Sequence, residues 1–219
     1  MRSAHLRLAI ESAPRRTFAI ALDWPGWARA GRGEDAAVDG LLAAAARYDA
    51  VLRRVGLELP AMPARVEVVE RLPGSSGTDF GVPGAIADVD RLPTDPAEAA
   101  RLASVVEASW AAFDAIAGAA PEALRKGPRG GGRDRSKVVA HVIEADAAYA
   151  REIGVRLRPA VPSDETGVAA MRGAMLDILR APSDGSPLAG RHWPQRYAVR
   201  RIAWHALDHT WEIEDRIEP

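Results

Sequence analysis

The sequence contains no cysteine. This absence excludes a disulfide framework, a thiolate metal site and a catalytic thiol, and it is compatible with a reducing compartment. Lysine is nearly absent as well, with Lys126 and Lys137 as the only two, so the basic side chains are almost all arginine. A metal site in this chain therefore has no thiolate ligand.

Neither sign of charge is in surplus. The net charge is −1. Residues 1–92 contain 12 basic and 12 acidic side chains, and residues 93–219 contain 17 basic and 18 acidic ones. A protein that mainly neutralises phosphates carries a basic surplus, so the balance argues against nucleic acid as a partner.

A long hydrophobic run is also missing. No continuous apolar stretch approaches the roughly 20 residues that span a bilayer. In the first 16 residues, apolar and polar side chains alternate as in a strand, and the apolar centre of a signal peptide is missing. We therefore expect a cytoplasmic protein without membrane contact.

The first part of the chain mixes two periodicities. Alternating apolar residues predict strands, and apolar residues at three- and four-residue steps over 34–55 predict a helix that Gly56 ends. The predicted strands cover 6–10, 17–22 and 65–72. Residues 73–96, rich in glycine, serine and proline, are expected to be loop and linker. The fold class is thus α+β, beginning with a small β-β-α-β domain at 1–92.

Residues 93–219 have the pattern of an antiparallel four-helix bundle. The expected helices begin at 94–96 and cover about 137–157, 164–179 and 194–216. Asp95 before Pro96 is a typical helix start. Ser136 is the expected N-cap of the second helix, and Pro159 and Pro162 are expected to end it.

Three histidines interrupt the apolar stripes of two predicted helices. His205 and His209 lie at an i, i+4 spacing in the inner row of the last helix, and His141 lies mid-stripe in the second. An i, i+4 pair projects two imidazoles from one helix face, which lets both reach a single cation. If the two helices are neighbours, His141 completes a three-histidine site for one divalent ion, of a kind that bundle cores can hold.

A carboxylate follows each histidine by three residues: Glu144, Asp208 and Glu212. At this spacing an acid can bond a neighbouring imidazole, or act as a fourth ligand or general base. Glu144 and Asp208 are the predicted catalytic residues, which would move a proton. Ordinary surface pairing, such as Glu212 with Arg216, is the competing interpretation.

Two further features leave alternatives open. The three histidines could be hydrogen-bonded core residues without a metal. The glycine-rich segment 125–135 carries five basic residues and is either an anion cradle at the start of a helix or a solvated connection.

The second part of the chain resembles the DinB-like family of four-helix bacterial metalloproteins. The resemblance rests on His141 in VVAHVIEAD and on His205 and His209 in RIAWHALDHTWEIEDR. It implies a zinc or nickel ion and, as in some members of the wider superfamily, a transferase or isomerase reaction that uses a low-molecular-weight thiol such as mycothiol. We expect a metal-dependent transferase or hydrolase that acts on a small molecule. The resemblance also leaves a homodimer open.

Residues 5–70 resemble the HicB-like fold, through two strands, a Pro-Gly turn and a helix in TFAIALDWPGWARAGRGEDAAVDGLLAAAARYDAVL. This resemblance implies a second hypothesis, in which the N-terminal module binds a protein or RNA partner and the helices form a scaffold. Binding of such a partner by 1–92 alone would distinguish this hypothesis from the enzyme.

Overall fold

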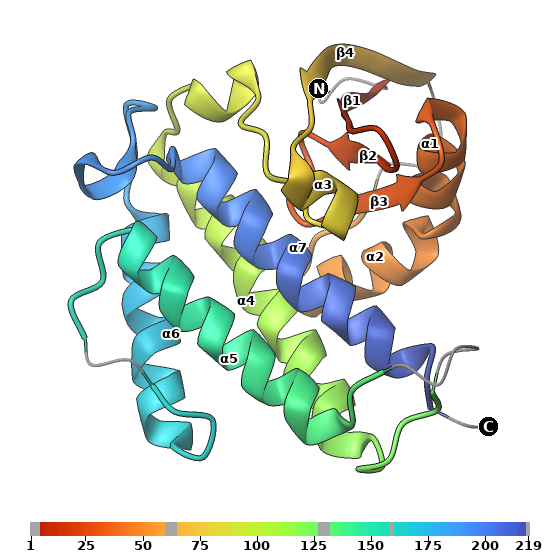
Figure 1. Cartoon of the computed structure of the whole chain (residues 1–219). Helices are drawn as coiled ribbons and strands as arrows, with labels where there is room; N and C mark the ends of the chain where they lie inside the picture. The colour runs from red at the N-terminus through yellow and green to blue at the C-terminus, as the bar shows by residue number, and fades with distance from the viewer. Residues whose placement is uncertain (1–4, 60–64, 127–131, 158–159, 218–219) are drawn as a thin grey trace.

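The computed structural model describes residues 5–59, 65–126, 132–157 and 160–217. The described chain is α+β, with a four-stranded mixed sheet and seven α-helices (Figure 1). The α+β class predicted from the sequence is confirmed.

The sheet has the strand order β3-β2-β1-β4. Its strands are β1 (His5–Ser12), β2 (Thr17–Ala21), β3 (Ala28–Gly31) and β4 (Arg65–Pro73). β1 pairs antiparallel with β2 and parallel with β4. Both faces are buried: Leu8 and Ile10 point to the side of the first helices, whereas Ala9 and Ile20 pack against Trp204 on the other side.

Three local elements differ from the prediction. β3 was not expected, because its four residues are too short to show a period. The predicted helix at 34–55 is divided at Ala44 into α1 (Glu34–Ala43) and α2 (Ala45–Leu52), followed by a 3-10 turn that ends at Gly56, whose φ is 68°. The bend lets α1 cover β2 and β3 while α2 packs on α4 (Pro96–Ala119). The predicted loop contains α3 (Ser76–Phe80) and a 3-10 turn at Asp88–Arg91.

The close packing of α1 on the sheet explains one glycine. A Cβ at Gly31 would lie 2.3 Å from the backbone nitrogen of Ala37. Real Cβ atoms do not approach so closely, so only glycine allows α1 to cross β3 at this point.

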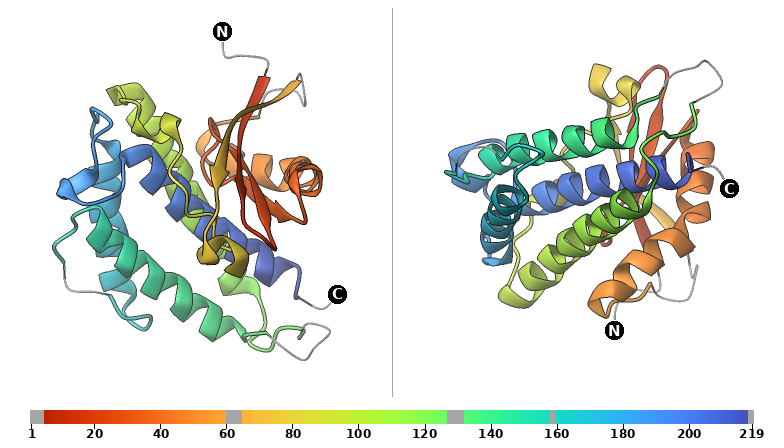
Figure 2. Two further views of the ribbon diagram at one scale, coloured as in Figure 1. Left: turned by 45° about the horizontal axis from the view of Figure 1, so that its top comes forward. Right: turned by 90° about the horizontal axis from the view of Figure 1, so that it is seen from below.

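Four long helices form what we call the helical layer: α4, α5 (Arg135–Glu152), α6 (Glu165–Arg180) and α7 (Gln195–Glu214). Each packs on two others, since α4 and α5 both contact α6 and α7. Their apolar stripes share one core that includes Leu102, Phe113, Val142, Met175 and Ile202. Figure 2 shows the sheet, α1 and α2 on one side of α4 and α7, with α5 and α6 on the other.

The directions of these helices are set by contacts at their ends. The amide of Arg125 donates to the carbonyl of Arg216, which joins the ends of α4 and α7, so these two helices run the same way. Backbone hydrogen bonds between Thr94 and Ser183 join the start of α4 to the end of α6, which run in opposite directions. The structure therefore differs from a strictly antiparallel arrangement, because the long α5–α6 connection carries the chain back to the end at which α5 began.

The helix boundaries agree with the sequence in part. Asp95 caps α4 as predicted, its Oδ1 accepting the amide of Glu98 at 2.8 Å. The predicted Ser136 cap of α5 is wrong, because Asp134 occupies the N-cap. α5 ends at Glu152, before Gly154 with a φ of 92°, so Pro162 does not end it; Pro159 lies outside the described residues.

The sheet and the helical layer share buried side chains. Leu41 and Tyr48 from the N-terminal part belong to one hydrophobic cluster with Val105, Leu207 and Trp211 from α4 and α7. In the described part of the chain, α4 is the one helix long and apolar enough to cross a membrane, and half of its most apolar window is buried inside the protein. A core helix has these same properties, so they are weak evidence for a membrane span.

Candidate metal centre

The three predicted histidines come from two helices that lie side by side. His141 is on α5, and His205 and His209 are on consecutive turns of α7. Figure 1 shows these two helices as neighbours. One ligand nitrogen from each ring lies within 4.8 Å of the other two. The three side chains are therefore close enough to hold a metal ion.

One nitrogen–nitrogen distance fits coordination of a common ion. Nε2 of His205 lies 3.2 Å from Nε2 of His141. Two imidazole nitrogens bound at about 2.0–2.1 Å to one ion, with an angle between 90° and the tetrahedral value, are about 2.8–3.4 Å apart. The three ring centroids are separated by 4.6, 4.9 and 5.1 Å, and the ring of His209 stands nearly perpendicular to both others.

The site is buried on the side of α7 and partly open on the side of α5. His205 and His209 are 6% and 8% exposed, and His141 is half-buried. Burial lowers the pKa of His205 well below its usual value, and the nearby charges of His209 and Arg201 add to this effect. The pKa of His141 is lowered by burial and then by the charges of His209 and Arg133. Neutral imidazoles are the form that binds a metal.

Glu212 orients one of the rings. Nδ1 of His209 donates to Oε2 of Glu212 at 2.6 Å, so the lone pair of this imidazole lies on Nε2. Glu212 also accepts hydrogen bonds from Arg133 at 3.2 Å and from Arg216 at 3.1 Å. Burial alone would raise the pKa of Glu212, but the bond from His209 and these positive charges lower it to about 2. A carboxylate behind a ligand histidine is the usual outer contact of a metal site.

His205 has no such support. Its Nδ1 is buried and has no hydrogen-bond partner among the described residues. An unpaired buried nitrogen costs about 1–3 kcal/mol, so the protein keeps this imidazole in place at the expense of stability.

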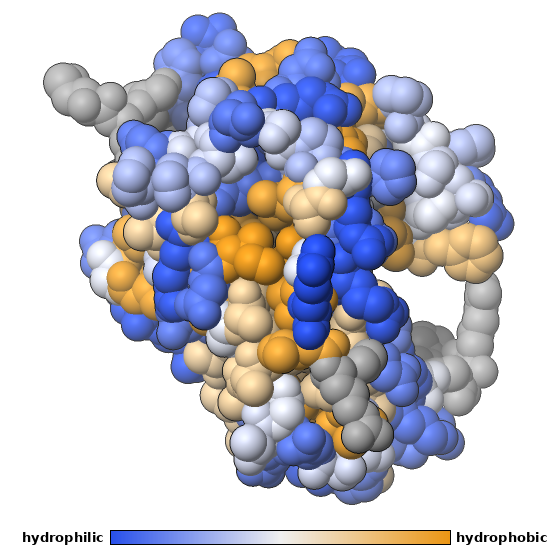
Figure 3. Space-filling model, turned by 90° about the vertical axis from the view of Figure 1, so that its left-hand side faces the viewer, coloured by the Kyte–Doolittle hydropathy of each residue, from blue (hydrophilic) through white to orange (hydrophobic). Residues whose placement is uncertain are grey.

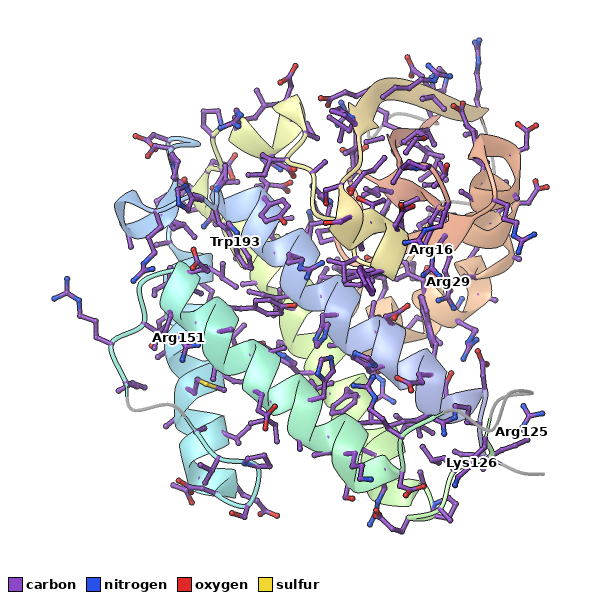
Figure 4. The ribbon with its side chains drawn as sticks, in the orientation of Figure 1. Arg16, Arg29, Arg125, Lys126, Arg151 and Trp193 are labelled. Carbon is purple, nitrogen blue, oxygen red and sulfur yellow. The ribbon has the colours of Figure 1, made fainter. Side chains whose placement is uncertain are left out.

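The two predicted catalytic carboxylates lie at the edge of the site. Glu144 is exposed on α5, one turn after His141. Its negative charge raises the pKa of His141, but burial and the nearby positive charges lower that pKa by more. Asp208 is 41% exposed, and its Oδ1 lies 3.6 Å from Nη1 of Arg29 on β3, beside α7 (Figure 4). Desolvation raises the pKa of Asp208. Among the described residues, neither acid hydrogen-bonds one of the three histidines; Glu212 is the carboxylate that does.

Aromatic side chains wall the site toward the start of α7. The ring of Tyr149 stands edge-on to His205 at 5.6 Å and contacts Trp193 at 5.3 Å. Trp193 lies at the start of α7, close to the end of α5 (Figure 4). The guanidinium of Arg201 lies over Tyr149 at 5.6 Å and over Trp204 at 5.0 Å. On this side, the rings of Tyr149 and Trp204 border His205, and Arg201 lies over both rings.

Sequence reasoning missed two basic residues near the histidines. Arg201 lies four residues before His205, so it shares the face of α7 that carries His205 and His209, and this spacing could have been read from the sequence. Arg133 comes from the glycine-rich segment, and only the fold brings it to Glu212. Residues 127–131 of that segment, and with them the predicted anion cradle, lie outside the described residues.

Comparison with protein-family models, curated proteins and solved structures finds no match to this chain. The class that the fold and the site define is therefore an α+β protein with three histidines placed to hold a metal ion. Its function has to be argued from this geometry.

Proposed function

We propose that this protein is a metal-dependent enzyme that binds one divalent ion through His141, His205 and His209. The observation that carries the proposal is the meeting of three buried or half-buried imidazoles, from two helices, within 4.8 Å. The 3.2 Å approach of two Nε2 atoms supports it, because two nitrogens bound to one ion lie at this separation; without an ion, the pair would form a single hydrogen bond there.

The ligand set favours zinc or nickel. Imidazole nitrogens suit both ions, and three protein ligands leave coordination positions for a substrate. The ligands are neutral, so an ion held there would supply strong Lewis-acid chemistry to a small molecule, as in a transferase or hydrolase. Glu212 would hold the ring of His209 in its ligand orientation.

The charges around the site favour an anionic substrate. Arg196 and Arg200 on α7 each pair with a carboxylate, Glu98 at 3.0 Å and Asp90 at 2.5 Å. Arg201 has no carboxylate within ion-pair distance among the described residues; it donates to the carbonyl oxygen of Pro83 at 3.3 Å and lies against Tyr149. A guanidinium without a carboxylate partner, one turn from His205, would orient a carboxylate or phosphate group of the substrate.

Glu144 and Asp208 are proposed to carry the proton of the reaction. Each lies one turn from a histidine and is in part accessible to solvent. Arg29 holds Asp208, whereas the structure gives Glu144 no ion pair among the described residues, so Glu144 is the freer of the two to move a proton.

The order of the ligands supports a DinB-like assignment of the helical layer. One histidine lies on the second of four long helices and an H-x3-H pair on the fourth. In that assignment a low-molecular-weight thiol would be a co-substrate at the ion, and the N-terminal part would be a HicB-like module. These assignments rest on the ligand pattern and on the order of the elements.

Metal analysis of the purified protein tests the proposal. We expect about one zinc or nickel ion per chain by mass spectrometry, and loss of this ion in His209→Ala. His192→Ala is the matched control, because His192 is exposed and lies outside the cluster. Equal metal contents in the two variants would contradict the proposal, as would a wild-type protein that takes up no ion when reconstituted.

A further inference from the structure

The side of the molecule formed by α6 carries an area of hydrophobic residues surrounded by polar ones (Figure 3). A groove of about 780 Å³ lies along this helix, between the end of α4 and the first halves of α5 and α6. Its volume falls in the range of about 300–1,000 Å³ that small-molecule sites occupy. Val139 and Ile143 line it from α5. Each lies two residues from His141, about 200° around the helix, so the groove and the histidines are on opposite sides of α5.

The walls of the groove are mostly apolar. Phe113 and Ala117 contribute from α4, and Val168 and Ala169 from α6. A Cβ at Gly118, which also lines the groove, would meet no atom within 4 Å. The groove therefore has room for the apolar body of a ligand.

One buried cation provides a polar end. Arg172 is 8% exposed, donates from Nε to Asp146 at 3.0 Å and from Nη1 to Asp114 at 2.9 Å, and lies over the ring of Trp110 at 5.0 Å. These contacts hold the guanidinium in one orientation. Its Nη2 is buried and has no hydrogen-bond partner in the described part of the chain. A ligand oxygen that accepts from Nη2 would remove the cost of about 1–3 kcal/mol that an unpaired buried donor carries.

The charge of the lining decides the class of ligand. The positive Arg135 and Arg172 are balanced by Asp114 and Glu165 among the residues of the groove. Asp146, directly behind Arg172, adds a further acid. An anionic ligand would gain no net attraction here, whereas an uncharged group that accepts a hydrogen bond fits Nη2.

We infer that this groove is a second binding site, for an uncharged small molecule with an apolar body and one hydrogen-bond acceptor such as a ketone or amide oxygen. The acceptor meets Nη2 of Arg172, and the apolar body lies along Val139, Ile143 and Val168. The inference is independent of the metal centre, because none of the three histidines lines the groove.

Fluorescence titration with prodan, an uncharged naphthyl ketone, tests this site. We expect saturable binding with blue-shifted emission by the wild type, and binding at least about tenfold weaker by Gly118→Leu, whose side chain fills the groove. Gly173→Leu on α6 is the matched control: its Cβ also meets no atom within 4 Å, and it does not line the groove. Thermal unfolding of both variants checks that they fold.

A second probe tests the role of Arg172. Dimethylaminonaphthalene, which lacks the ketone, should bind about tenfold more weakly than prodan, because a hydrogen bond from a charged donor is lost. Equal binding of the two probes would overturn the assignment of Nη2. Equal binding of prodan to Gly118→Leu and Gly173→Leu, or no saturable binding to the wild type, would overturn the site itself.

Discussion

Two buried polar clusters lie in the helical layer, and their groups are paired in different ways. Between α4, α5 and α6, Asp146 accepts hydrogen bonds from Trp110 at 3.2 Å and Arg172 at 3.0 Å, so its charge is matched within the protein. Between α5 and α7, three imidazoles meet, and two Nε2 atoms face each other at 3.2 Å. The first cluster is built from opposite charges, whereas the second brings together three imidazoles close enough to hold a metal ion.

One cluster is held by matched charges, and the other is the proposed metal site. The buried pair of Asp146 and Arg172 restrains the packing of the helices, with Nη2 of Arg172 as its one nitrogen without a hydrogen-bond partner among the described residues. Neutral imidazoles are the form that binds a metal. The substitutions below should therefore affect stability in the first cluster and metal affinity in the second.

The largest effect should come from breaking the ion pair. Asp146 is 1% exposed in the wild type and loses its positive partner in Arg172→Ala, so we expect a loss of about 3–5 kcal/mol in the free energy of unfolding. Urea denaturation measures this. The double variant Arg172→Met with Asp146→Leu removes both charges and should recover much of the loss; equal losses in both proteins would mean that the pair is not the cause.

Removing the metal should have the next largest effect on stability. An ion present at 100 times its Kd stabilises the folded state by about 2.7 kcal/mol, and at this chain length 1 kcal/mol corresponds to about 2–4 °C in Tm. Chelation should thus lower the Tm of the wild type by about 5–10 °C. The Tm of His205→Ala should not respond to the chelator, and a response of equal size would place the ion elsewhere.

Glu212→Gln should weaken the metal site without changing its ligands. Loss of the charged acceptor behind His209 is expected to lower the metal affinity about 10–100-fold, measured by competition with a chromophoric chelator. Glu144→Gln is the control, because Glu144 hydrogen-bonds none of the three histidines among the described residues. The metal affinity of this variant should stay within about twofold of the wild type. A larger loss of metal affinity in Glu144→Gln than in Glu212→Gln would assign the supporting role to Glu144.

The smallest effect concerns pH and Asp146. Burial raises the pKa of Asp146 to about 6, against the opposing charge and hydrogen bond of Arg172. Between the unfolded value near 4 and this folded value, the folded state binds more protons, so the contribution of Asp146 to stability falls as pH rises through this window. The stability of Asp146→Asn should lack this fall between about pH 4 and 6. An unchanged pH profile would assign the titration to another group.

The sequence predicted the parts of the molecule that local periodicity encodes. The i, i+4 spacing of His205 and His209 on one helix, and the stripe position of His141 on another, were sufficient to expect that they meet. The α+β class and the cap of α4 by Asp95 also followed from short patterns.

What the sequence did not show depends on long-range placement. β3 has only four residues, too few to show the alternation of apolar and polar side chains that predicts a strand. Its place depends on pairing with β2 and on the crossing of α1. The contact of Arg133 with Glu212 joins residues 79 positions apart. α4 and α7 run in the same direction because α6 begins at the end of the helical layer where α5 begins. The periodicity of a helix gives no information about its direction relative to other helices.

X-ray absorption spectroscopy on the reconstituted protein tests the central claim most directly, because it reports the atoms around the ion. The account predicts a first shell at about 2.0–2.1 Å with the multiple-scattering signature of three imidazoles, reduced in His141→Ala. A shell of oxygen atoms without imidazole scattering, or a spectrum unchanged by His141→Ala, would contradict it.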